Sequence, residues 1–310
     1  MFKYSLDNKR YHTLNYFYRT KFNNKVFKVP IDANMSCPNK INGNGCIYCS
    51  SFSKSNIINS NDSIKEQFLS NITILEKKWP NSLYIPYFQA GSNTFAPLNE
   101  LKKLYESLLN YEKVVGLAIA TRPDCLSNEI IDYLDKLNKK TFLTIELGLQ
   151  SSNNKTLHFI KRGHDVECFT KAVKKLKEKG IFVVAHIING LPYETEEDMI
   201  NTIKYLNNLG IDGIKIHMLY ISKNTELAEI YEKEKFHILE KDEYIDIVIK
   251  QLELLNDNIV IERITGDPVK EELITPNWLL KKFCVLNDID KEMVKRNTYQ
   301  GENTKKNVEN

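Results

Sequence analysis

IFVVAHII, at residues 181–188, is a short and nearly continuous run of apolar side chains that directly follows VECFTKAVKKLKEKG, at residues 166–180. In the earlier segment apolar residues recur every three or four positions, which is typical of an amphipathic helix. A strand that is apolar on both faces is typical of a parallel sheet covered by helices. The two segments therefore predict one helix and one buried strand of an α/β fold.

The same alternation extends in both directions along the chain. Five further buried strands, separated by amphipathic helical patterns, are predicted in VFKVPIDA (26–33), LYIPYFQA (83–90), VVGLAIA (114–120), TFLTIELGL (141–149) and GIKIHMLY (213–220). Thr195 followed by Asp198 is a capping-box pattern at one helix start, and Gly210 follows the end of that helix. Six β-α units predict a parallel sheet that is either doubly wound or curled into a full or partial barrel, and periodicity does not choose between them.

The pattern divides the chain into four parts. Residues 1–25 form a basic, aromatic N-terminal arm, and residues 26–224 form the α/β core. Residues 225–301 are a C-terminal extension of helices with one predicted strand at 258–266. The polar segment 302–310 is expected to be a disordered tail.

Composition and charge narrow the possible functions. Charged side chains make up 27% of the 310 residues, and no apolar run approaches the roughly 18 residues of a membrane-spanning helix. The N-terminal sequence lacks the apolar stretch and cleavage site of a secretory signal, so we expect a cytoplasmic protein with no membrane partner. The net charge of +3 does not by itself imply a polyanionic partner.

Three of the six cysteines lie close together in MSCPNKINGNGCIYCS, at residues 35–50. Cys37 is followed by eight residues, Cys46, two residues and Cys49. This loop comes directly after the first predicted strand, at the sheet edge where parallel α/β folds carry their chemistry. Cytosolic thiols are kept reduced, so these cysteines are expected to bind a metal or to react rather than to form disulfides.

Three thiolates hold a 4Fe-4S cluster at three corners and leave the fourth iron open for a reacting ligand. A structural zinc site usually has four ligands in two pairs. Here there is one pair and one outlier, and a fourth ligand would have to come from a histidine or from Cys125, Cys168 or Cys284. Spacing favours an iron-sulfur cluster and leaves a zinc site or three unconnected thiols open.

A series of motifs extends this picture over residues 10 to 301. They are, in order, IDANMSCPNKINGNGCIYC, YFQAGSNTFAP, ATRPDCL, IELGLQS with IKRGHD, INGLPYET, IHMLYISKNTELA, IERITGDP, and NWLLKKFCVLNDID with RNTYQG. Together they resemble the radical S-adenosylmethionine (SAM) superfamily, and within it the YtqA/YhcC/MnmL-like group related to the radical SAM domain of the Elongator catalytic subunit. Two positions depart from that pattern: Asn34 stands where the family favours glycine, and Gly91 where it favours a bulkier residue.

The resemblance implies a partial (β/α)6 barrel with the N-terminal arm and the C-terminal extension attached. It implies that Cys37, Cys46 and Cys49 hold a 4Fe-4S cluster whose open iron is chelated by SAM. Reduction would cleave SAM to methionine and a 5′-deoxyadenosyl radical that abstracts hydrogen from the substrate. An electron donor such as flavodoxin or ferredoxin is an expected partner.

Residues near the predicted strand ends are candidates for the SAM pocket. Tyr48 resembles the aromatic position beside the adenine. Glu146 is a candidate acceptor for a ribose hydroxyl or the methionyl ammonium, with a buried structural pair as the alternative. The other cofactor-binding candidates are Gln89, Asn93, Thr94, Thr121, Arg122, Gln150, Asn189 and Gly190.

Cations and aromatic residues alternate in the first 28 residues, with seven Lys or Arg against one acid. This combination suits single-stranded RNA, because cations contact phosphates and rings stack on bases. Lys281, Lys282 and Arg296 are a second basic set and candidate substrate-binding residues, with a solvated helix face as the alternative.

The family resemblance implies tRNA wobble-uridine modification, from a 5-carboxymethylaminomethyl to a 5-aminomethyl group, with a downstream methyltransferase as a further candidate partner. Two other functions stay open. One is a radical SAM enzyme that acts on a small metabolite or a peptide, and the other is a zinc-stabilised RNA-binding protein.

Overall fold

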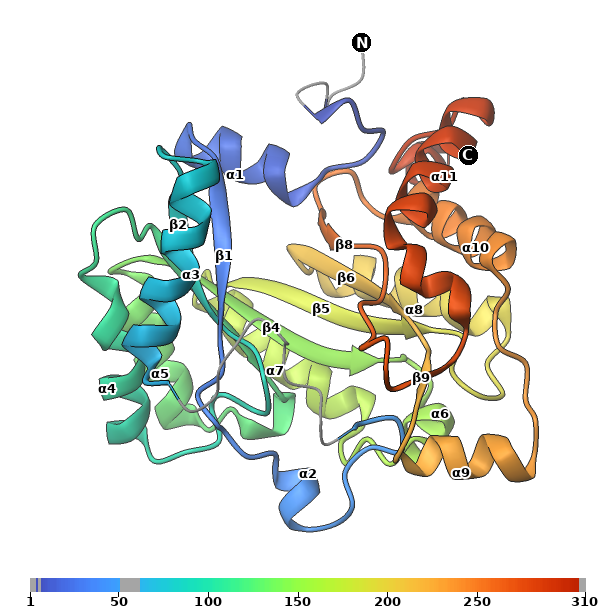
Figure 1. Cartoon of the computed structure of the whole chain (residues 1–310), viewed down its shortest axis with the longest axis horizontal. Helices are drawn as coiled ribbons and strands as arrows, with labels where there is room; N and C mark the ends of the chain where they lie inside the picture. The colour runs from blue at the N-terminus through green and yellow to red at the C-terminus, as the bar shows by residue number, and fades with distance from the viewer. Residues whose placement is uncertain (1–3, 5–6, 51–61, 307–310) are drawn as a thin grey trace.

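The computed structural model describes residue 4 and residues 7–50 and 62–306. Within them, seven parallel strands form one sheet that curls into a half-barrel, in the order β1-β2-β3-β4-β5-β6-β8 (Figure 1). The strands are β1 (Val26–Ile31), β2 (Leu83–Phe88), β3 (Gly116–Thr121), β4 (Phe142–Gln150), β5 (Phe182–Asn189), β6 (Gly213–Met218) and β8 (Val260–Arg263). The α/β class, the partial barrel and the six predicted core strands are confirmed.

Helices cover the outer face of this sheet, and shorter helices lie at its ends (Figure 1). The covering helices are α3 (Ile64–Lys78), α4 (Leu98–Leu109), α5 (Asn128–Asn138), α7 (Val166–Glu178), α8 (Glu196–Leu209) and α10 (Lys241–Leu254). The others are α1 (Leu14–Phe22), α2 (Pro38–Ile41), α6 (Asn154–Phe159), α9 (Glu226–Lys233), α11 (Lys282–Lys295) and α12 (Glu302–Lys306), with 3-10 turns η2 (Pro123–Cys125) and η3 (Asn277–Lys281). A small antiparallel pair joins β7 (Ile221–Ser222) to β9 (Leu273–Thr275).

Local sequence signals account for the element boundaries. At the start of α8 the Thr195 side chain accepts from the Asp198 backbone N–H while the Asp198 carboxylate accepts from the Thr195 N–H, and Gly210 ends the helix at φ +73°. Along β4, Leu143, Ile145 and Leu147 are fully buried in the main core. Burial of such side chains contributes about 1.5–3 kcal/mol each.

The sheet extends beyond the predicted core, because β8 from the C-terminal extension pairs with β6 as a seventh strand. β1 and β8 are the two edges of the sheet, and the N-terminal segment bridges them. The Ile261 N–H donates to the His12 carbonyl at 2.7 Å, and α1 contacts both edge strands.

The aromatic side chains of the N-terminal arm largely pack inward. Tyr11 and Tyr18 are buried, and the Phe17 ring centroid lies 5.0 Å from that of Phe182 and 6.0 Å from that of Phe142. The expectation that the arm offers its rings to RNA bases is therefore wrong for these residues, because they cover the amino-terminal end of the barrel.

The predicted disordered tail begins instead with an ordered helix. α12 packs on α10, and the Thr298 hydroxyl donates to Glu302 at 2.6 Å. The packing of α12 on α10 depends on tertiary structure and leaves no local sequence signature, whereas Thr298 and Glu302 lie only four residues apart. Residues 307–310 lie outside the described part. Among the described helices, none combines the length and apolar character needed to cross a bilayer.

Candidate active site

The cysteine loop follows β1 and is anchored between α6 and α9. The Ile47 N–H donates to the Ile160 carbonyl at 3.1 Å, and the Ile47 carbonyl accepts from the Leu227 N–H at 2.9 Å. The Ile47 side chain is buried among apolar residues from the same elements. Because Ile47 lies next to Cys46 and two residues before Cys49, these bonds fix the backbone that carries both thiols.

Both departures from the family pattern have a backbone explanation. Asn34 adopts φ +52°, in the left-handed region that glycine adopts freely and that asparagine enters more readily than most other residues. Gly91 has φ +74°, and a Cβ there would lie 2.0 Å from the Met35 carbonyl oxygen. The loop after β2 can therefore approach the cysteine loop only because position 91 has no side chain.

Gly91→Ala is expected to displace the cysteine loop and lower the iron content of the purified protein. The left-handed backbone costs alanine about 1–2 kcal/mol, and the collision with the Met35 carbonyl adds to it. Gly180→Ala is the matched control, since Gly180 has φ +64° but no atom within 4 Å of a Cβ. Iron content and unfolding free energy measure the effect; equal losses in the two variants would contradict the close approach at Gly91.

Two side chains direct donors at the Cys46 sulfur, and Arg122 supports one of them. The Arg162 guanidinium is buried, with Nη1 3.7 Å from the Cys46 sulfur and Nη2 donating to the Gly148 carbonyl at 2.8 Å. Asn39 Nδ2 lies 3.5 Å from the same sulfur. Arg122 pairs with Asp124, and its Nη1 donates to the Arg162 carbonyl at 2.9 Å. These donors favour negative charge on sulfur.

The chemistry of this site fits an iron-sulfur cluster. Cys37, Cys46 and Cys49 are free thiols on one loop, and a buried cation beside Cys46 would offset the charge of cluster thiolates. The described residues contain no preassembled group of three metal ligands. Cys37, Cys46 and Cys49 would be the protein ligands of that cluster.

Among the predicted cofactor residues, Asn93 has a buried hydrogen-bond acceptor that no donor satisfies. It is fully buried, and its Nδ2 donates to the Ala90 and Ala120 carbonyls at 3.0 Å, whereas Oδ1 has no hydrogen-bond partner among the described residues. A buried acceptor without a partner fits an ammonium group such as that of SAM. The hydroxyls of Thr94 and Thr121 lie 2.6 Å apart and hold this loop against β3.

The remaining cofactor candidates do not all lie around one site beside the cysteine loop. Tyr48 adjoins Cys46, and burial together with that sulfur raises the pKa of Tyr48 well above its ordinary value. Gln89 is half-buried after β2, and Gln150 ends β4 at φ +80°. Asn189 instead exchanges two amide hydrogen bonds with Gln251 of α10, at 2.8 and 2.9 Å, so its side chain faces the helix layer. Gly190 adopts φ +80° beside it.

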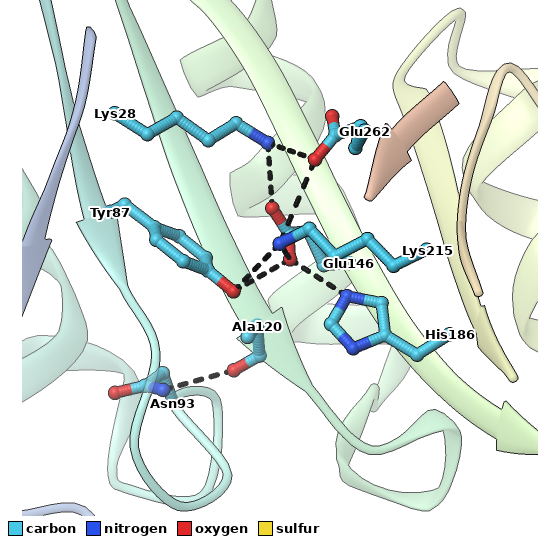
Figure 2. A network of polar contacts seen from close by, with 8 residues as sticks. All are labelled: Lys28, Tyr87, Asn93, Ala120, Glu146, His186, Lys215 and Glu262. Carbon is cyan, nitrogen blue, oxygen red and sulfur yellow. Dashed lines mark hydrogen bonds and ion pairs between the residues drawn. The ribbon is translucent and has the colours of Figure 1, made fainter. Parts of the chain in front are cut away.

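A buried network of charges crosses the barrel interior (Figure 2). Glu146 accepts from Lys28 and from the Tyr87 hydroxyl, both at 2.7 Å, and its Oε2 lies 2.8 Å from His186 Nε2. The second lysine of the network, Lys215, also pairs with Glu146. Glu146 was predicted to accept from SAM, but its oxygens are already engaged, so the alternative of a buried structural pair describes this residue.

The network also joins the two edges of the sheet. Lys28 of β1 lies 2.5 Å from Glu262 of β8, and Lys215 of β6 lies 3.6 Å from the same carboxylate. Burial alone would raise the pKa of Glu146, but the charges of Lys215 and Lys28 outweigh it and hold that pKa well below its ordinary value. Both carboxylates are therefore counter-charges to the lysines.

His217 is expected to make folding sensitive to mild acid. Burial, and then the neighbouring charges of His186 and Arg263, lower the pKa of His217 well below 6.5. The folded protein holds it neutral while the unfolded chain protonates it, so its contribution is complete above pH 6.5 and is lost as pH falls below that value. One such group changes the unfolding free energy by up to about 1.4 kcal/mol per pH unit.

His217→Gln should accordingly flatten the dependence of unfolding free energy on pH between 6.5 and 5, measured by denaturant unfolding at each pH. His158→Gln, at an exposed position on α6, is the control. An unchanged slope in His217→Gln would contradict a half-buried His217 that stays neutral in the folded protein.

The three predicted substrate residues do not form one patch. Lys281 is exposed, and Lys282 pairs with Asp267 at 2.9 Å. Arg296 lies at the other end of α11, about 20 Å away by helix rise. It pairs there with Asp246 at 2.8 Å and Glu292 at 3.0 Å. Arg296 is thus largely neutralised by acids, as a solvated helix face would be.

Several site residues escaped the sequence analysis. Arg162 and Asn39 lie in recognised motifs, but nothing local showed that they would meet at Cys46. Lys28 and Lys215 had a usable signal, because each is a lone lysine inside an otherwise apolar strand predicted to be buried. A buried charge requires a partner, and Glu146 was the matching acid.

Comparison with known proteins agrees with this geometry. The Radical SAM superfamily model matches residues 37–206, and the Radical_SAM C-terminal domain model matches residues 211–295.

YtqA of Bacillus subtilis (strain 168) is 43% identical over 304 residues, 97% of this chain and 94% of YtqA. A tRNA uridine(34) acetyltransferase of Methanocaldococcus infernus is 32% identical over 154 residues, 49% of this chain and 28% of that enzyme. The solved structure of archaeal Methanocaldococcus infernus Elp3 has the same fold, with a TM-score of 0.68 at 22% identity over 89% of this chain and 64% of that one.

The superfamily match begins at Cys37 and includes all three clustered cysteines. The relative that spans nearly the whole chain extends the match to the C-terminal elements. The cysteine loop at the carboxyl end of a parallel half-barrel, the donors around Cys46 and these matches lead to one conclusion: the chain belongs to the radical SAM superfamily, and is an enzyme with a 4Fe-4S cluster and SAM as cofactors.

Proposed function

We propose that this radical SAM enzyme modifies tRNA, and that it converts the 5-carboxymethylaminomethyl group of a wobble uridine to 5-aminomethyl. The observation that carries the proposal is the 32% identity, over 154 residues, to an enzyme named for its action on uridine 34 of tRNA. The matched region is only 28% of that enzyme, so we propose a tRNA substrate from this likeness and do not propose acetyl transfer.

An exposed aromatic side chain at the start of α11 supports an RNA substrate. The Phe283 ring is 72% exposed, and the Lys282 ammonium lies 5.7 Å from its centroid. Exposed Lys281 precedes this pair. The exposed ring suits stacking on a base from a single-stranded loop, and Lys281 suits a phosphate contact, while Lys282 is held by Asp267.

The bound cofactors supply one-electron chemistry, namely reductive cleavage of SAM to a radical that abstracts hydrogen from the substrate. The chain's own residues hold and shield that chemistry: Arg162 offsets cluster charge, Asn93 offers an acceptor to the SAM ammonium, and the half-barrel limits access of water. An electron donor such as flavodoxin or ferredoxin, and a methyltransferase acting on the product, complete the proposal.

The test compares tRNA nucleosides from cells with and without the gene. Loss of 5-aminomethyl-derived uridines with accumulation of 5-carboxymethylaminomethyluridine is the expected result. An unchanged wobble-uridine profile would reject this substrate. Purified enzyme with dithionite and SAM provides the second measurement: 5′-deoxyadenosine formed only in the presence of a peptide or metabolite extract, and not with tRNA, would support a different substrate class.

A further inference from the structure

Arg263 is the last residue of β8, so it lies at the carboxyl end of the parallel strands, the end at which the cysteine loop follows β1. The β6–β8 register shifts here: Ile214 is paired with Ile261, but Lys215 is paired with Arg263, so Glu262 is passed over. Register partners on neighbouring parallel strands share a face of the sheet, and Lys215 points into the barrel toward Glu146 and Tyr87 (Figure 2). Because of the shift, two consecutive residues lie next to the interior network: Glu262 contacts its lysines, and Arg263 is the register partner of Lys215.

Arg263 differs from the other interior cations because its charge is not matched. Lys28 and Lys215 each contact two carboxylates. The Arg263 guanidinium is exposed and makes no hydrogen bond or ion pair within the described parts of the chain. Its charge reaches inward, since it lowers the pKa of His217 along with burial and His186.

A cavity of about 310 Å³ adjoins this guanidinium, at the seam between β8, the N-terminal segment and α11. Its lining includes Asn15, Glu262, Arg263, Gly266 and Lys282. The Oε1 atom of Glu262 is buried and has no hydrogen-bond partner among the described residues. The cavity is thus lined by Arg263, whose unpaired guanidinium suits a carboxylate, and by Glu262, whose buried Oε1 lacks a partner and would suit an amine.

We propose that Arg263 binds the carboxylate of the substrate's carboxymethylamino group while Glu262 accepts a hydrogen bond from its amine, so that this pair selects the carboxylated substrate. This rests on the proposed function, because the carboxymethylaminomethyl group bears both an amine and a carboxylate. The product keeps only the amine, so it would lose the Arg263 contact. Arg263 is then a specificity-determining residue.

A tRNA phosphate offers Arg263 similar chemistry. The Glu262 Oε1 atom favours the first, because a carboxylate oxygen without a hydrogen-bond donor gains nothing from a phosphate but complements an amine that lies two bonds from a carboxylate. The position of Arg263 on an inward-facing register, rather than on an outer helix, also suits a small side group better than a nucleic-acid backbone.

The experiment measures binding of 5-carboxymethylaminomethyluridine and of 5-aminomethyluridine, as free nucleosides, to the cluster-loaded protein. The wild-type protein is expected to prefer the carboxylated nucleoside by about tenfold or more, as for a charge-assisted bidentate contact. Arg263→Gln should reduce that ratio to near one, and Arg263→Lys should retain part of it. Arg19→Gln, an exposed arginine on α1, makes the same charge change as a control and should leave the ratio intact.

Equal binding of the two nucleosides by the wild-type protein, or an unchanged ratio in a cluster-loaded Arg263→Gln protein, would overturn the inference. The inference would also be overturned if Arg263→Gln lost affinity equally for tRNA with either modification and its log affinity depended less steeply on log salt concentration, by a slope of about one. That result would mark a phosphate contact. The nucleoside ratio needs no turnover. If the protein prefers the carboxylated nucleoside through Arg263 but leaves tRNA unmodified, the proposed function is rejected and the binding site is kept. If it modifies tRNA but shows no such preference, the binding site is rejected and the proposed function is kept.

Discussion

Cys46→Ala is expected to abolish SAM cleavage. Cys46 is the cysteine with the most elaborate surroundings, since Arg162 and Asn39 both direct donors at its sulfur. Without this thiolate the cluster loses one of three protein ligands. Groups that only support a metal ligand already cost about 10–100-fold when removed, so the loss of activity should exceed about 100-fold. Formation of 5′-deoxyadenosine under dithionite, with iron and sulfide content, measures the effect.

The control is Cys284→Ala, an exposed cysteine on α11. It should keep the iron content and the brown colour of the wild-type protein. Full iron content and SAM cleavage in Cys46→Ala would show that Cys46 is not a cluster ligand. Zinc in place of iron in anaerobically prepared wild-type protein would contradict the cluster itself.

Glu146→Gln is expected to lower the unfolding free energy by about 3–5 kcal/mol, the usual cost of removing one partner of a buried ion pair. Glu146 is fully buried, and Lys28 and Lys215, whose side chains are 10% and 7% exposed, depend on it for charge compensation. The stabilisation is present above pH 4.5, the ordinary pKa of glutamate, and is lost as pH falls toward the depressed folded-state value. Denaturant unfolding at pH 7 measures the change.

Two further variants separate charge from packing in this network. Replacing Glu146 and Lys215 together with methionine removes one charge of each sign, so it should destabilise less than Glu146→Gln despite the larger change. Asp135→Asn breaks an exposed pair with Lys139 and should cost less than about 1 kcal/mol. A Glu146→Gln loss as small as that of Asp135→Asn would mean that water solvates the network.

Much of the fold was predictable because it depends on local pattern. The runs at 181–188 and 166–180 became β5 and α7 within a residue or two, and the cap at Thr195 formed as its sequence indicated. The N-terminal arm was misread for the opposite reason. Tyr11, Phe17 and Tyr18 interleave with cations in the sequence, but the open end of a barrel buries their rings, and no local pattern reveals that opening.

The sequence by itself determined the order of strands and helices, the three cysteines of the cluster loop and the need for glycine or asparagine at tight positions, because spacing, periodicity and backbone sterics act over a few residues. Only the tertiary structure decided that Arg162 meets Cys46 across 116 residues, that Glu146 joins Lys28 and Lys215, and that the β6–β8 register shifts so that Arg263 is the partner of Lys215. Such pairings depend on strand register and barrel curvature. These are set by packing of the whole sheet against its helices, so no stretch of sequence contains them.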